Sequence, residues 1–175
     1  MKSKDIAIVG ILLAIGAILR YFLTALHTPL TPNMIIAFYC LAIILIRPKV
    51  YEALGIGIVA GILSMLISSS MFPPANLVSE PLGALTCFGL YALLANRTKL
   101  APTVTTFLST LVSGFSFAAI AIIFVGATVL QKYNGNIWNF VIVFVPIVVI
   151  TAVFNAIIVQ ILYLPSSRVL SRGQE

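Results

Sequence analysis

Long apolar runs separated by short polar breaks dominate the sequence. Such runs predict membrane-spanning helices, because about 20 apolar residues cross the hydrocarbon core of a bilayer. The chain has six of them, over residues of about 6–26, 32–46, 51–70, 81–95, 102–130 and 137–164. The second and fourth are short for a crossing, which is tolerated where a segment lines a cavity rather than faces lipid. We therefore expect an all-α integral membrane protein, a six-helix transmembrane bundle forming one domain over residues 1–175.

The break before the fourth run carries a helix-start signal. Pro81 follows Ser79 and Glu80. Proline is favoured at the first helical position, where its missing N–H costs no hydrogen bond. The sequence therefore predicts that the fourth helix begins at Pro81, with Ser79 or Glu80 as its N-cap.

Composition and charge placement support the membrane assignment and predict an orientation. Of the residues, 61% are hydrophobic and only 8% charged, whereas soluble domains carry about 25% charge. Most basic residues fall at alternate breaks and at both ends: Lys2, Lys4, Arg47, Lys49, Arg97, Lys99, Arg168 and Arg172. Only two basic residues, Arg20 and Lys132, fall on the opposite side of the membrane. By the positive-inside rule we expect both termini in the cytoplasm.

Several functional classes are disfavoured by what the sequence lacks. It contains neither a Gly-x-x-x-x-Gly-Lys-Ser/Thr phosphate loop nor a His-Glu-x-x-His motif. One histidine and four acidic residues give little material for metal or acid–base clusters. We expect no cofactor, no metal, no nucleic-acid partner and no catalysis. Turnover that depends on Glu80 or His27 would indicate an intramembrane enzyme instead.

The few polar residues gather on the predicted outer side. Ionisable residues in or beside spanning helices are costly and often functional. Arg20 and Glu80 could contact the carboxylate and the ammonium group of one ligand. Alternatively, Arg20 reaches the lipid headgroups and Glu80 stabilises a helix N-terminus.

Three asparagines and two aromatic residues complete the candidate substrate site. Asn33 and Asn76 lie in outer loops that could close over a ligand, although Asn76 also suits a turn. Asn155 lies within the sixth run and needs a hydrogen-bond partner, either another helix or the ligand. Phe115 could line an aromatic pocket or pack against lipid. Trp138 could do the same or belong to the interfacial aromatic belt.

Small residues mark two helix faces that allow close helix approach. In the third run, Gly57 and Gly61 are expected to pack inside the bundle. In the first run, Gly10, Ala14 and Ala17 could instead contact a partner protein.

Several of these stretches also carry a family resemblance. They are Pro32-Asn33-Met34, Arg47-Pro48-Lys49, the segment from Gly55 to Gly61, and above all the loop from Pro74 to Pro81. With these motifs the chain resembles the substrate-binding S components of energy-coupling-factor (ECF) transporters. Within that class it is similar to the tryptophan transport protein family.

The resemblance implies a six-helix S-component bundle in a prokaryotic plasma membrane that captures a small molecule from outside. The substrate would be tryptophan or a related aromatic amino acid or precursor. It further implies a transmembrane T component, docked on Gly10-x-x-x-Ala14, and two cytoplasmic ATPases that supply the energy. An S component for another vitamin or small metabolite, or a structural membrane subunit without a ligand, remains an alternative.

Overall fold

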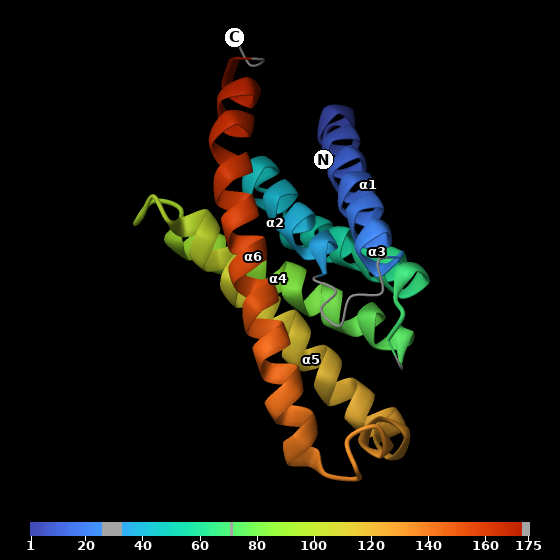
Figure 1. Cartoon of the computed structure of the whole chain (residues 1–175). Coiled ribbons are helices and arrows are strands. Elements are labelled where there is room, and N and C mark those ends of the chain that lie inside the picture. The colour runs from blue at the N-terminus through green and yellow to red at the C-terminus, as the bar shows by residue number, and fades with distance from the viewer. Residues whose placement is uncertain (26–32, 71, 173–175) are drawn as a thin grey trace.

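The computed structural model describes residues 1–25, 33–70 and 72–172, with side chains up to residue 167. The loop expected over residues 27–33, His27 included, lies outside this part except for Asn33. The described part is helical throughout, with no strands, and the helices succeed one another along the chain (Figure 1). Their bounds are α1 Ser3–Ala25, α2 Met34–Ile46, α3 Val50–Ile67, the 3-10 turn η1 Pro73–Ala75, α4 Asn76–Leu94, α5 Ala101–Gln131 and α6 Ile137–Arg172.

Helix α2 forms the centre of the bundle. It packs against all five other α-helices, and every residue from Met34 to Ile44 is buried. A helix that is apolar on all sides is expected in such a position. Its 13 residues rise about 20 Å, which is less than the roughly 30 Å thickness of the hydrocarbon core. The other five α-helices are long and apolar enough to cross a membrane.

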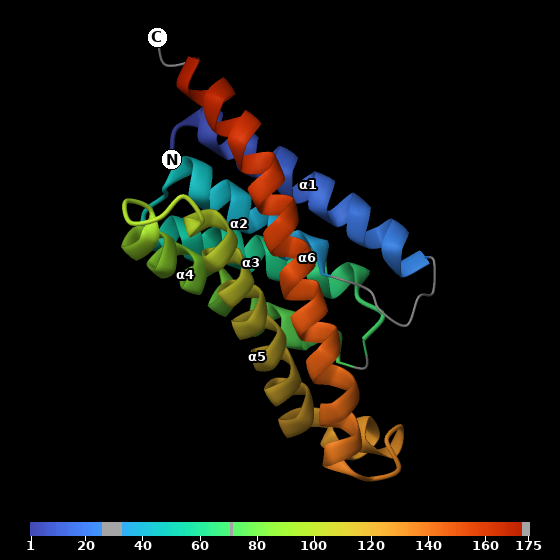
Figure 2. The ribbon, with the colours of Figure 1, turned by 60° about the vertical axis from the view of Figure 1, so that its left-hand side comes forward.

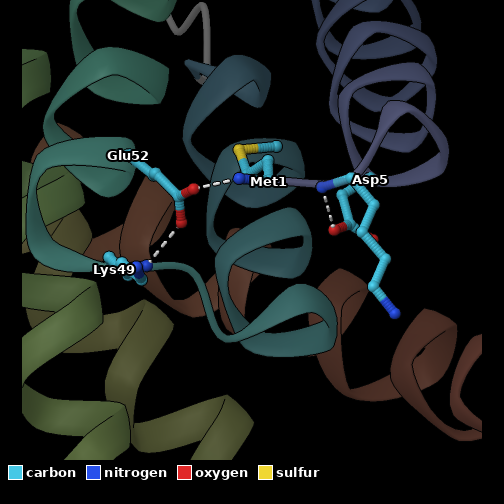
Figure 3. Close-up of polar contacts among 5 residues, drawn as sticks. Met1, Asp5, Lys49 and Glu52 are labelled. Carbon is cyan, nitrogen blue, oxygen red and sulfur yellow. Dashed lines mark hydrogen bonds and ion pairs between the residues drawn. The ribbon is translucent and has the colours of Figure 1, made fainter.

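The start of α1 and the end of α6 lie at the same end of the bundle as the α2–α3 and α4–α5 turns (Figure 2). The amine of Met1 pairs there with the carboxylate of Glu52, which also accepts a hydrogen bond from the backbone N–H of Lys49 (2.7 Å; Figure 3). The Arg47 guanidinium lies 5.5 Å from the centre of the Tyr91 ring. The basic turns therefore share one end of the protein; which side of the membrane this end faces stays a prediction.

The predicted start of the fourth helix was wrong. Helical structure begins at Pro73 and continues into α4, so Pro81 lies inside the helix and neither Ser79 nor Glu80 is its N-cap. The reason is that Pro73 and Pro74 already occupy the helix start, where proline is favoured. Helix α3 is also shorter than expected, ending at Ile67 rather than residue 70.

Close packing of α3 on α4 depends on two glycines. A Cβ on Gly57 would lie 2.7 Å from the Pro81 Cα, and one on Gly61 would lie 2.8 Å from the backbone oxygen of Asn76. The interpretation of these glycines as an internal packing face is thereby confirmed. This contact fixes the first turns of α4, which carry Asn76 and Glu80.

Candidate functional site

A cavity of about 490 Å³ opens near the end of the bundle opposite the termini. Small-molecule sites usually fall between about 300 and 1,000 Å³. Helices α1, α2, α4, α5 and α6 contribute lining residues, and the segment that follows α3 adds three serines. The lining residues are Arg20, Thr24, Asn33, Ile36, Ser68, Ser69, Ser70, Asn76, Ser79, Glu80, Thr110, Ser113, Gly114, Phe117, Lys132, Tyr133, Phe144, Ile147, Val148 and Thr151.

Glu80 is the acidic residue of the cavity and is only 1% exposed. Asn33 Nδ2 donates a hydrogen bond to Glu80 Oε1 (2.5 Å), and Ser113 Oγ donates one to Oε2 (3.0 Å). A buried carboxylate is costly unless it is hydrogen-bonded or paired with a cation. Two neutral donors orient Glu80, but no cation among the described residues forms an ion pair with it.

Two cationic residues, Arg20 and Lys132, line the same cavity. Within the described residues neither forms an ion pair with Glu80, and the buried Nη1 of Arg20 has no hydrogen-bond partner. The cavity thus holds separated charges of opposite sign. A ligand with one cationic and one anionic group could contact both.

Aromatic rings form another part of the wall. Phe117, Tyr133 and Phe144 line the cavity. Phe140 packs against two of these rings. Its ring centre lies 5.4 Å from the Tyr133 ring centre in an edge-on contact and 5.0 Å from the Phe144 ring centre in a stacked contact. These contacts hold the Tyr133 and Phe144 rings in place, so the wall offers ordered π-surface to a flat ligand.

The structure brings four of the predicted site residues together and places three elsewhere. Arg20, Asn33, Asn76 and Glu80 line the cavity. Asn155 does not; it is fully buried, and its Nδ2 donates hydrogen bonds to the Asn33 backbone oxygen (3.1 Å) and to Thr110 Oγ1 (3.3 Å). This is the interhelical alternative considered for Asn155.

Phe115 and Trp138 are placed away from the cavity lining. Phe115 is 43% exposed and Trp138 is 69% exposed. On α5 the cavity is reached by Thr110, Ser113 and Phe117, which share one helix face because they are spaced three and four residues apart. The hydroxyl side chains of Thr110 and Ser113 are the feature of the sequence that marks this face of α5.

The small residues of α1 divide between two surfaces. Gly10 and Ala14 are exposed, and a Cβ on Gly10 would meet no atom within 4 Å. Ala17 is half-buried and packs on the core. Of the three predicted docking residues, two therefore lie on the free surface of α1.

The fold and its cavity define a multi-pass helical membrane protein with a site of small-molecule size. The family model described as "Tryptophan transporter TrpP" matches residues 2–171. A Bacillus subtilis (strain 168) protein named "Probable tryptophan transport protein" is 31% identical over 177 residues, which cover 99% of this chain and 96% of that protein. No solved structure matches the chain.

The chain belongs to the tryptophan transporter TrpP family. The resemblance inferred from the sequence is confirmed. The family is one of transporters rather than enzymes, and this chain is a multi-pass protein of the plasma membrane.

Proposed function

We propose that this chain is the substrate-binding S component of an ECF-type importer and that it binds tryptophan or a closely related aromatic amino acid or precursor. The observation that carries the proposal is the charge arrangement in the cavity. Glu80 and Arg20 line it without forming an ion pair, and Arg20 Nη1 is buried without a hydrogen-bond partner among the described residues. An α-amino acid supplies both missing partners, an ammonium group for Glu80 and a carboxylate for Arg20.

The apolar part of the cavity suits an indole ring. Phe117, Tyr133 and Phe144 could stack on it or meet it edge-on, with Ile147 and Val148 beside them. Asn76 is held by a hydrogen bond from its Nδ2 to the Pro73 oxygen (2.8 Å), which leaves its side-chain oxygen for the ligand.

The transport role requires partners. The sequence contains no Gly-x-x-x-x-Gly-Lys-Ser/Thr phosphate loop. In the proposed role two cytoplasmic ATPases would supply the energy through a transmembrane T component. The exposed Gly10 and Ala14 on α1 offer the small-residue surface on which the T component would dock. If Gly10→Leu no longer co-purified with the T component but still bound the ligand, this result would support the surface as the docking site.

A thermal-shift screen of the purified protein against amino acids and vitamins tests the substrate. A ligand that binds only the folded state stabilises it by about 2.7 kcal/mol at a hundredfold excess over its Kd. We expect tryptophan or its close analogues to raise the melting temperature. A shift with an unrelated vitamin would keep the S-component role but replace the substrate, and no shift together with no ATPase partner would favour a structural subunit.

A further inference from the structure

Lys132 reaches the cavity from a segment that is set apart from the rest of α5. The 31 residues of α5 would rise about 46 Å as a straight helix, well beyond the roughly 30 Å hydrocarbon core. Val125 interrupts the helix with non-helical backbone angles (φ −134°, ψ 28°). The last turns of α5 accordingly run in a different direction from the rest of the helix (Figures 1 and 2). Because of this break, Lys132 and Tyr133 line the cavity.

Lys132 has no acidic partner within the part of the chain that the structure describes. Among those residues Glu80 is the only acidic one in the cavity lining, and the ion pairs do not include Lys132. Arg20 enters from α1 and Lys132 from the end of α5, so two cations from different elements face one cavity. A carboxylate has two oxygens with about four acceptor positions and can accept from both cations.

We propose that Lys132, together with Arg20, binds the carboxylate of the substrate and so determines that the site accepts α-amino acids rather than aromatic amines. The inference rests on the proposed function and adds a residue that binds the carboxylate of the ligand. Glu80 binds the ammonium group. The alternative is that the flexible Lys132 side chain extends to the lipid headgroups and contributes nothing to the choice of ligand.

Three ligands separate the two ends of the site. Tryptophan carries both charged groups, tryptamine lacks the carboxylate, and indole-3-propionate lacks the ammonium group. Equilibrium binding of each is measured on purified wild type, Lys132→Gln and Lys132→Arg. Lys99→Gln, which changes an exposed lysine at the opposite end of the bundle, is the matched control.

Lys132→Gln should weaken the binding of tryptophan and of indole-3-propionate by about tenfold, which is the loss expected for one charge-assisted hydrogen bond. The affinity for tryptamine should be unchanged. Lys132→Arg should restore most of the loss, and Lys99→Gln should bind all three ligands like wild type. Lys132 is exposed, so the unliganded variants should keep the wild-type melting temperature.

If Lys132→Gln changed the affinity for all three ligands equally, or for none of them, the assignment of Lys132 would be overturned. Tryptophan binding to wild type would still uphold the proposed function. If wild type bound none of the indole ligands, the proposed function would fail first and the role of Lys132 would fall with it.

Discussion

Asn33 and Glu80 are 47 residues apart in the sequence, yet the Asn33 amide donates a hydrogen bond to the Glu80 carboxylate. The backbone oxygen of Asn33 in turn accepts a hydrogen bond from Asn155 on α6. The start of α2 is thereby tied to both α4 and α6 beside the cavity. The acidic end of the site is held by contacts between helices rather than by a loop alone.

Replacing Asn155 should loosen this connection without removing a group from the cavity wall. Asn155→Ala loses the hydrogen bonds to Asn33 and Thr110. Interhelical hydrogen bonds in membranes are worth about 0.6–2 kcal/mol each. We expect a lower melting temperature in detergent and weaker tryptophan binding. The exposed Asn96 provides a control, since Asn96→Ala should change neither quantity. Unaltered stability in Asn155→Ala would contradict the role given to these bonds.

Two phenylalanines on α5 test the position of the aromatic wall. Phe117 lines the cavity, whereas Phe115, two residues earlier, lies outside the lining and is 43% exposed. Phe117→Ala should weaken tryptophan binding by about tenfold, through lost ring contact and lost apolar burial. Phe115→Ala should bind tryptophan like wild type, as measured by isothermal titration calorimetry. The opposite order of effects would mean that α5 is rotated relative to the cavity.

The third helix offers a test of packing that is independent of any ligand. Gly57→Ala places a methyl group 2.7 Å from the Pro81 Cα, and a backbone atom cannot move away cheaply. Overpacking of this kind costs about 1–3 kcal/mol. We expect a clear drop in the melting temperature of the unliganded protein. Gly55→Ala meets no atom within 4 Å and should be tolerated. Equal stability of the two variants would argue against the close α3–α4 contact.

Much of the helical architecture could be predicted because each apolar run is bounded by turn residues. The turns at Arg47–Lys49 and Arg97–Lys99 separate helices as expected. The start of α4 could not be predicted correctly, because Pro73, Pro74 and Pro81 all carry the same local signal. Only the packing of α4 on Gly57 and Gly61 shows that the helix continues through Pro81.

The polar part of the site was accessible from the sequence, and the aromatic part was not. Arg20, Asn33, Asn76 and Glu80 were noticeable because polar residues are rare in this chain. The aromatic wall depends on the rotation of α5 and α6, whose sequences are apolar on nearly all sides. Only the hydroxyls of Thr110 and Ser113, which share a helix face with Phe117, distinguish Phe117 from Phe115 in the sequence. The α5 break at Val125, which brings Lys132 to the cavity, is signalled in the sequence only by the length of the run and by Gly126 beside it.

The most direct test of the account is saturation binding of radiolabelled tryptophan to purified wild type and Glu80→Gln, side by side. Glutamine keeps the size of the side chain and an oxygen that can accept from Asn33 or Ser113, but it removes the charge that would hold the ammonium group. Glu52→Gln, an acidic residue at the opposite end, is the matched control. We predict saturable binding to wild type and Glu52→Gln, and a loss of about tenfold or more in Glu80→Gln. Equal affinity in Glu80→Gln and wild type would contradict the assignment of this cavity as the tryptophan site.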